Sequence, residues 1–340
     1  KNIINKKNEN EKEQLLDDLL EDFKEVNRLK KIEYLEGEFA KNLDENSFKT
    51  GKDTLLSPKK AAKVLGVSES SVKRWCDAGH LSVVKTSGGH RRISIQTLMT
   101  FARSKGHNLE NPQLIDLPTV NANVPENEPY ELLKNLMHAL SKGHEDTVRS
   151  ILISRWMSGE PLANIFDRLL APAFSGLGHQ WRSNEIEIYE ERRAILIVER
   201  SFADMRRLVG TSKPNAPLAV GCTFEGDPYS MPTAMCELTL LELGWNAQNL
   251  GPWQPLISIT QAIKNIQPRL CWLSVSKVDK PETFPQEISE LYATAEENNC
   301  ALILGGRGVS DPDFRKTLEF SGYCDSMSQF TKLAKQIHSA

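Results

Sequence analysis

Residues Pro58-Lys-Lys-Ala-Ala-Lys-Val-Leu-Gly-Val-Ser-Glu-Ser-Ser-Val-Lys-Arg-Trp75, followed closely by Ser87-Gly-Gly-His-Arg-Arg92, form the stretch that decides the fold. Apolar residues recur at helical spacing at Ala61, Ala62 and Leu65. Gly66 can end this first helix, and Ser68 can cap a second one. Two short helices joined by a tight turn are the spacing of a helix-turn-helix.

The residues behind the second helix predict a β-hairpin. Leu81 to Lys85 alternates apolar and polar side chains, and Ser87-Gly88-Gly89 offers a turn that needs positive φ. Arg91-Arg92-Ile93 then returns as a second strand. The pattern predicts a β-wing tipped with cations.

The charge of this region differs from that of the whole chain. From Lys59 to His107 there are ten Lys or Arg residues against two acids, whereas the whole chain has a net charge of -3. Clustered cations on a second helix and a wing suit phosphate neutralisation, and a helix of that size fits a major groove. On charge alone, a solvated basic face is an equally good interpretation.

Leu65, Val72, Trp75 and Ile93 are most simply the core of a small domain, and we assign them no role in DNA binding. The start of the second helix and the wing carry cations that have little packing purpose there. Most of these side chains are expected to touch phosphate. The predicted DNA-contacting residues are Ser70, Ser71, Lys73, Arg74, Lys85, Thr86, His90, Arg91 and Arg92.

The order of helix, wing and Gly-Gly-His-Arg-Arg over residues 54 to 106 resembles the winged helix-turn-helix of the MerR family. The resemblance implies double-stranded DNA as the partner. It also implies a homo-oligomer, a dimer or tetramer, that reads palindromic or repeated operator sites.

The composition bounds the rest of the chain. Its 340 residues exceed one typical core, so two or three domains are expected. No run approaches the roughly 20 apolar residues of a spanning helix, and the N-terminal residues are not signal-like, so we expect a cytoplasmic protein without a membrane partner. Six cysteines lie without a Cys-x-x-Cys pair, which suggests neither a zinc site nor a redox motif. We interpret most of them as buried small hydrophobes.

Two segments differ from their surroundings in composition. Residues 1–50 carry thirteen acids and ten bases around Leu16, Leu19, Phe23 and Val26, which predicts one charged amphipathic helix, either a short coiled coil or a docked extension. Residues 107–129 are rich in asparagine and proline and predict an interdomain linker.

The C-terminal two thirds predict a multidomain α and α/β chain. Within residues 130–212 periodic apolar positions mark four helices near 130 to 142, 145 to 157, 161 to 181 and 188 to 209, which favours a four-helix bundle. Within residues 215–340 short apolar strands at 218–222, 246–250, 270–275 and 301–304 alternate with helical stretches. Such alternation builds a doubly wound, Rossmann-like parallel sheet, whose ligands lie beyond the carboxyl ends of the strands. Residues 223–231, 274–277 and 305–308 are expected to surround that crevice.

A helical bundle followed by this α/β module resembles the cobalamin-binding region of methionine synthase. Together with a MerR-type head, residues 54–340 resemble the CarH/LitR light-responsive repressors. In the bundle, the resemblance places Trp181, Glu191 and Arg192 over the upper face of a corrin ring. In the α/β module, it assigns the cofactor-binding positions Asp227, Tyr229, Ser274, Ser276, Gly305 and Gly306.

Two residues depart from the family pattern. Tyr229 stands where the family has the histidine that ligates cobalt from below, and Arg192 stands where it has a histidine on the upper face. A phenol is a poor substitute for a neutral imidazole, and an arginine offers a metal no lone pair. Arg192 is expected either to pair with Glu191 or to contact a carboxylate of a ligand. Trp181 is expected either to belong to the bundle core or to cover the ligand. Cobalamin or another tetrapyrrole remains an open cofactor, whereas His-ligated cobalamin and a protein-bound metal are not expected.

These features predict a DNA-binding transcriptional regulator, a repressor rather than an enzyme. Its C-terminal module would sense a ligand or assemble the oligomer, with an altered tetrapyrrole-like ligand or none. The alternatives are a light-sensing repressor that retains corrinoid binding, and a corrinoid carrier or methyltransferase-type protein. No catalytic constellation is evident in the sequence.

Overall fold

A computed structural model describes residues 55–119, 129–210 and 215–339, apart from the side chains of residues 129 and 339. The charged helix predicted over residues 1–50 lies outside the described residues. The same holds for residues 120–128 of the predicted linker.

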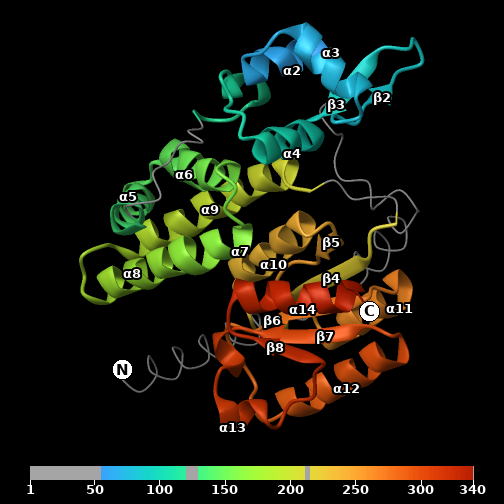
Figure 1. Ribbon diagram of the computed structural model, residues 1–340. Coiled ribbons are helices and arrows are strands. Elements are labelled where there is room, and N and C mark those ends of the chain that lie inside the picture. The colour runs from blue at the N-terminus through green and yellow to red at the C-terminus, as the bar shows by residue number, and fades with distance from the viewer. Residues whose placement is uncertain (1–54, 120–128, 211–214, 340) are drawn as a thin grey trace, which may run out of the picture. The chain divides into compact units, whose positions relative to one another are not determined.

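The first described module is a small winged helix-turn-helix (Figure 1). Its elements are β1 (Leu55–Leu56), α2 (Pro58–Leu65), α3 (Glu69–Asp77), β2 (Val84–Lys85), β3 (Arg91–Ser94) and α4 (Ile95–Lys105). The three strands form one antiparallel sheet in the order β1-β3-β2. We call residues 55–106 the reading head.

Local capping fixes the two helices of the turn. Ser57 caps α2 by accepting from the backbone N–H of Lys60, and Gly66 ends that helix at a φ of 67°. Ser68 caps α3 by accepting from the backbone N–H of Ser71. A hydroxyl oxygen satisfies a free N–H at a helix start, and glycine adopts positive φ at little cost, so the predicted stop and cap are confirmed.

The wing is a short hairpin in which Val84 pairs with Arg92 and Lys85 with Arg91. Gly89 turns the chain at a φ of 75°. The turn closes because the Gly89 N–H donates to the Thr86 carbonyl at 2.8 Å. The predicted cationic wing is therefore confirmed as structure.

The segment after α4 begins packed against the reading head. A short 3-10 turn, Pro112–Ile115, follows α4, and Leu109, Ile115 and Leu117 are buried. The Asn111 side chain donates to the Lys63 carbonyl at 2.7 Å and so holds this segment to the end of α2. The first part of the predicted linker therefore extends the head's core.

The helical module has the four predicted segments. They are α5 (Pro129–Lys142), α6 (Glu145–Met157), a long helix made of α7 (Leu162–Ile165), a π-helical turn (Phe166–Leu170) and α8 (Ala171–Arg182), and finally α9 (Ile188–Leu208). Leu136, Leu152, Phe166 and Val198 contribute to their shared core. The predicted bundle is confirmed.

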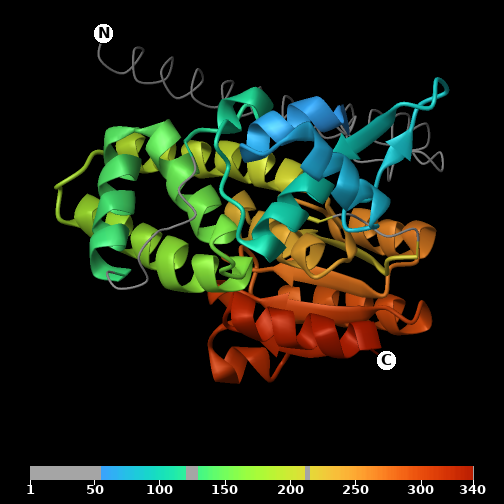
Figure 2. The same cartoon turned by 45° about the horizontal axis from the view of Figure 1, so that its top comes forward.

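The third module is a parallel sheet in the order β5-β4-β6-β7-β8. Its elements are β4 (Leu218–Thr223), α10 (Ser230–Glu242), β5 (Asn246–Asn249), α11 (Leu256–Ile266), β6 (Leu270–Ser274), α12 (Phe284–Glu297), β7 (Ala301–Gly305), a 3-10 turn (Arg307–Val309), α13 (Pro312–Arg315), β8 (Gly322–Cys324) and α14 (Met327–Ser339). Figures 1 and 2 show α14 and α12 on opposite faces of the sheet. The predicted fold class is confirmed, but β8 was not predicted, because Gly-Tyr-Cys has no apolar run.

The interior of the sheet module is filled by Trp272 on β6, which is 1% exposed. Its indole N–H donates to the hydroxyl of Thr233 on α10 at 2.9 Å. The ring lies against β4 at Gly221, where a Cβ would overlap it. Trp272 therefore occupies space between the sheet and α10, and Gly221 makes that possible.

Candidate functional site

The start of α3 is built from a cluster of serines. The Ser68 hydroxyl lies 2.8 Å from that of Ser70 and 2.9 Å from that of Ser71. Ser70 is exposed and Ser71 is partly buried. These two predicted DNA-contacting residues therefore take part in the hydrogen bonds that order the first turn of α3. Ser70 in the same turn faces solvent.

Two predicted cations are paired within the reading head. The Lys73 ammonium lies 2.8 Å from a Glu69 carboxylate oxygen, one helical turn away. The Arg91 guanidinium lies 2.6 Å from the Asp77 carboxylate and also donates to the Lys73 carbonyl at 3.4 Å. Hydrogen bonding to Asp77 raises the pKa of Arg91, which therefore stays charged. Arg91 thus bridges the wing and the last turn of α3.

Arg74, Lys85 and Arg92 present cationic groups with no carboxylate partner among the described residues. Arg74 and Lys85 are exposed, and Arg92 is partly buried and donates to the Arg91 carbonyl. His90 at the wing tip is also exposed, and its backbone N–H donates to the partly buried Thr86 hydroxyl. Unpaired cations on α3 and on the wing can bind anions without first breaking an internal ion pair.

The residues assigned to the core lie there or against it. Val72 and Ile93 are fully buried, and Leu65 is nearly so. Trp75 is partly buried, with its ring centroid 4.8 Å from that of Phe101 and 5.2 Å from that of His107. Trp75 therefore joins α3 to α4, as a core residue would.

We expect Arg91→Ala to loosen the wing, because the bridge to Asp77 and to the end of α3 is lost. The backbone amides of Thr86 and Gly89 should exchange with solvent several-fold faster, as measured by NMR. Arg92→Ala is the matched control, since its side chain reaches no group on α3. Equal exchange in the two variants would show that Arg91 does not hold the wing.

In the α/β module, Asp227 is fully buried and joins two loops. One carboxylate oxygen accepts from the backbone N–H groups of Ser276 at 2.5 Å and Lys277 at 3.2 Å. The other accepts from the Tyr229 N–H at 3.1 Å. The structure therefore brings Asp227 and Ser276 together as predicted positions, but the carboxylate is used to fix the loops after β4 and β6.

Ser274, Gly305 and Gly306 lie together at the carboxyl ends of β6 and β7. They line a cavity of about 90 Å³ with Trp272 and the two thiols of Cys236 and Cys324. Burial is the main cause that raises the pKa of Cys324 to about 12. The pKa of Cys236 is also raised by burial. Both thiols are therefore protonated at neutral pH, and the cavity is small and mostly apolar.

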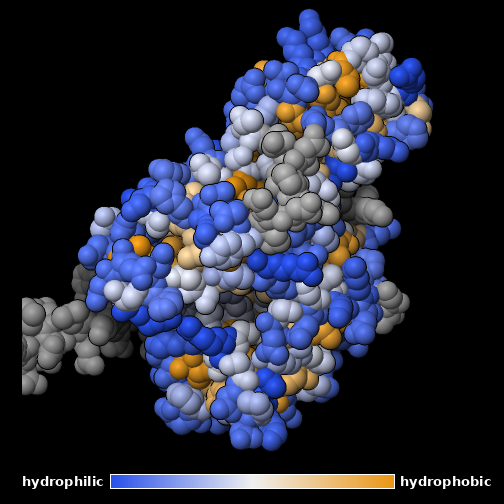
Figure 3. All heavy atoms as spheres, turned by 60° about the vertical axis from the view of Figure 1, so that its left-hand side comes forward, coloured by the Kyte–Doolittle hydropathy of each residue, from blue (hydrophilic) through white to orange (hydrophobic). Residues whose placement is uncertain are grey.

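The three bundle residues are partly or largely exposed. Trp181, in the last turn of α8, is 45% exposed. The guanidinium Nε of Arg192 lies 3.7 Å from a Glu191 carboxylate oxygen, and the Arg192 side chain is 70% exposed. Among the described residues, no hydrogen bond or ion pair joins these side chains to the strand ends. Figure 3 shows a face of the molecule on which exposed apolar side chains form small separate groups.

These residues do not fit a His-ligated cobalamin. Tyr229 is 43% exposed at the position of the lower ligand. Asp227 already accepts three backbone hydrogen bonds, which use most of its roughly four acceptor sites and leave little capacity to orient an imidazole. The cavity of about 90 Å³ is below the roughly 300 Å³ of small ligand sites. Among the described residues, no group of three or more His, Cys, Asp or Glu side chains is placed to hold a metal ion.

One residue counted with the basic region takes a different position. Arg103 on α4 donates to three backbone carbonyls in the last turn of α6 and just after its end. The sequence shows only a cation in the last turn of a helix, which is common at helix ends. Its partners are more than fifty residues away, so no local pattern could reveal them.

A family model described as a helix-turn-helix domain matches residues 55–106. The chain therefore carries a helix-turn-helix domain at the predicted position. No curated protein has a sequence that matches this chain. In the described parts of the chain, no helix is long and apolar enough to cross a membrane.

Several solved structures match part of this chain. A monomethylamine corrinoid protein of Methanosarcina barkeri is 14% identical, with a TM-score of 0.49, over 61% of this chain and 98% of that chain. A cobalamin-binding protein of Desulfitobacterium hafniense DCB-2 is 17% identical, with a TM-score of 0.33, over 60% and 98%. The methanol:cobalamin methyltransferase complex MtaBC of Methanosarcina barkeri is 18% identical, with a TM-score of 0.32, over 70% and 92%.

Proposed function

We propose that this protein is a DNA-binding transcriptional regulator of the MerR/CarH-like type and acts as a repressor. The observation that carries the proposal is a helix-turn-helix domain whose α3 and wing present Arg74, Lys85 and Arg92 without described acidic partners. In this proposal α3 enters the major groove and the wing contacts the flanking backbone. The protein performs no reaction and works in the cytoplasm.

The C-terminal modules act as the sensory and oligomerising part. Reading heads of this kind recognise two-fold or repeated operators, and a homodimer or tetramer raises their affinity through effective concentration. A ligand that binds one assembly better than another then shifts DNA occupancy. The ligand is an altered tetrapyrrole-like molecule, or none.

Binding to a random-sequence DNA library, followed by mobility shifts with the enriched sequence, tests the proposal. We expect an enriched site with internal symmetry or repeats, bound much more tightly than shuffled DNA at moderate salt. Absence of enrichment in every ligand condition would refute it. The DNA upstream of the protein's own gene is the first natural fragment to compare.

We expect cobalamin to bind without histidine ligation or not at all, and Tyr229→His not to raise its affinity. A new imidazole would meet an Asp227 carboxylate that already accepts three N–H groups at its roughly four acceptor sites, beside a cavity of about 90 Å³. Absorption spectra of wild type and variant, titrated with hydroxocobalamin and adenosylcobalamin in dark and light, measure this. A spectrum of imidazole-ligated cobalt in the variant would show that the pocket persists. Light-driven loss of the adenosyl group with a change of oligomer would favour the photoreceptor alternative.

A further inference from the structure

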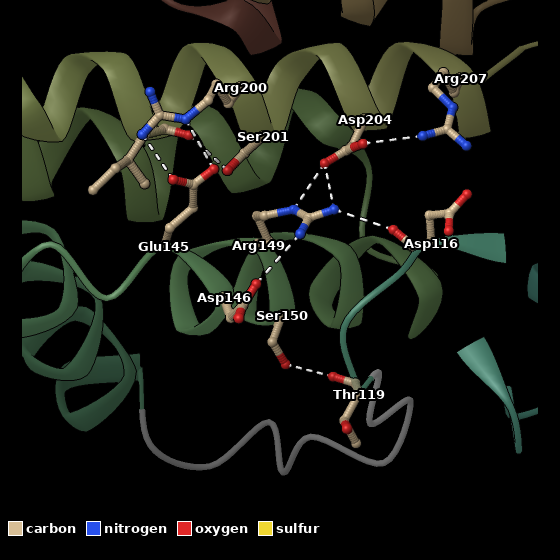
Figure 4. Close-up of polar contacts among 11 residues, drawn as sticks. Asp116, Thr119, Glu145, Asp146, Arg149, Ser150, Arg200, Ser201, Asp204 and Arg207 are labelled. Carbon is tan, nitrogen blue, oxygen red and sulfur yellow. Dashed lines mark hydrogen bonds and ion pairs between the residues drawn. The ribbon is translucent and has the colours of Figure 1, made fainter. Parts of the chain in front are cut away.

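Hydrogen bonds attach the reading head to α6 of the bundle at two places, and α4 also packs against α9. At the first, the Arg149 guanidinium of α6 pairs with Asp204 of α9 at 2.7 Å and donates to the Asp116 carbonyl at 3.2 Å (Figure 4). The Ser150 hydroxyl beside it donates to the Thr119 carbonyl at 2.6 Å. The chain that leaves the head is thus bonded to the side of α6.

The second attachment is made by Arg103 of α4 at the carboxyl end of α6. Its guanidinium donates to the carbonyls of Trp156 at 2.7 Å, Gly159 at 3.1 Å and Glu160 at 3.0 Å. It also lies over the Trp156 ring, 5.1 Å from the centroid. Carbonyls at a helix end carry partial negative charge, so a cation there is favourable.

Glu242, the last residue of α10, joins the third module to this attachment. One of its carboxylate oxygens accepts from the Trp156 indole N–H at 2.9 Å and pairs with Arg103 at 3.2 Å. The other accepts from the backbone N–H of Leu162, the first residue of α7, at 2.9 Å. The Glu242 and Arg103 side chains are 14% and 22% exposed. One nearly buried carboxylate therefore bonds the head, the bundle and the α/β module together.

The opposite end of α10 lies beside the strand-end loops. The helix begins at Ser230, directly after Tyr229, and the Ser230 hydroxyl donates to Glu199 of α9. The 13 residues of α10 span about 20 Å at the rise of an α-helix. A stiff helix thus runs from the predicted ligand crevice to the contact with the reading head.

We propose that Glu242 is a positioning residue that couples the α/β module to the reading head. A displacement of α10 relative to α7 breaks its bonds to Leu162 and Trp156 and removes the carboxylate from Arg103. The head then keeps the carbonyl contacts of Arg103, the bonds at Asp116 and Thr119 and the packing of α4 against α9, but α4 becomes less restrained at this junction. No hydrogen bond or ion pair of the described residues joins α3 or the wing to the bundle. The coupling therefore reaches the reading head through α4 and not through the side chains proposed to contact DNA. The idea that this coupling switches DNA binding rests on the proposed function. The mechanical coupling between the α/β module and the reading head does not depend on it.

Hydrogen exchange of α4 amides in the full chain tests the coupling. In Glu242→Gln and in Arg103→Lys we expect α4 to exchange about tenfold faster, because each leaves nearly buried partners incompletely bonded. Glu131→Gln is the matched control, since it makes the same chemical change in an exposed pair with Lys134. Unchanged exchange in Arg103→Lys would overturn the proposal, even where Glu242→Gln does not fold.

Transmission along α10 is tested from its far end. Ser230→Ala removes the bond to Glu199, and we expect faster exchange in α4 as well as in the first turn of α10. This effect on α4 should vanish when Glu242→Gln is already present, because both changes act through one junction. Faster exchange confined to α10 would overturn transmission.

A DNA-binding measurement distinguishes the proposed regulatory function from the proposed coupling through Glu242. With the enriched DNA site, Glu242→Gln should change affinity several-fold, whereas Glu131→Gln should not. Failure of the wild type to bind any DNA would refute the regulatory function but leave the exchange result to decide the coupling. Wild-type affinity in Glu242→Gln would show that the junction does not control DNA binding.

Discussion

Arg74→Ala combined with Arg92→Ala should reduce DNA affinity on the order of a hundredfold at physiological salt, because two phosphate contacts are lost. The slope of log affinity against log salt should become shallower by about 0.9 for each contact, because fewer counterions are released. Fluorescence anisotropy with the enriched operator at several salt concentrations measures both quantities.

Lys316→Ala is a control for the loss of a positive charge outside the reading head, although it removes one charge where the double variant removes two. This exposed lysine, which caps the end of α13, pairs only with the exposed Asp313 among the described residues, and its removal lowers the net charge without touching the reading head. The DNA affinity of Lys316→Ala and its slope of log affinity against log salt should equal those of the wild type. A lower affinity in the double variant with an unchanged slope would mean that Arg74 and Arg92 read bases or support the fold rather than bind phosphate.

Trp272→Ala should destabilise the α/β module by about 3–5 kcal/mol, the usual cost of deleting a buried aromatic side chain. The indole fills the space between β4, β6 and α10 and satisfies the Thr233 hydroxyl. Because a chain with several modules need not unfold in one step, native-state hydrogen exchange of β4 and α10 amides against urea is the measurement.

Trp181→Ala is the matched control, since it deletes the same side chain from an exposed position at the end of α8. Its effect on stability should stay below about 1 kcal/mol. A similar loss in both variants would contradict the assignment of Trp272 as the principal filler of the sheet module. In Trp272→Ala the existing cavity should also enlarge, so small aromatic molecules should restore part of the lost stability.

Local signals account for what the sequence predicted correctly. Ser68 and Gly66 act within a few residues of their own positions, and the periods of the apolar residues separate bundle helices from sheet strands. The β8 strand escaped prediction because Gly322–Cys324 gains its character only by pairing with β7. The positions of the strand-end residues followed from topology, since parallel strands end at one edge of a sheet.

Local sequence patterns could not predict the roles of individual polar side chains. Asp227 has the position expected of a ligand-orienting acid, yet it accepts N–H groups from a loop about fifty residues away. Arg91 and Arg74 are equal cations in the sequence, and only the position of Asp77 separates a bridging residue from an unpaired one. Arg103 likewise differs from its neighbours through the carbonyls at the end of α6 and the Glu242 carboxylate.

The sequence by itself determined the order of modules, the helix-turn-helix and its cationic wing, and the absence of histidine at the strand ends. These depend on residue type and short-range periodicity, which are written directly in the chain. Only the tertiary structure decided which charges are free, how small the strand-end cavity is, and that Glu242 meets Arg103. The reason is physical: a charge, a void or a hydrogen bond acquires its role from partners that folding brings within a few ångströms, whatever their distance along the chain.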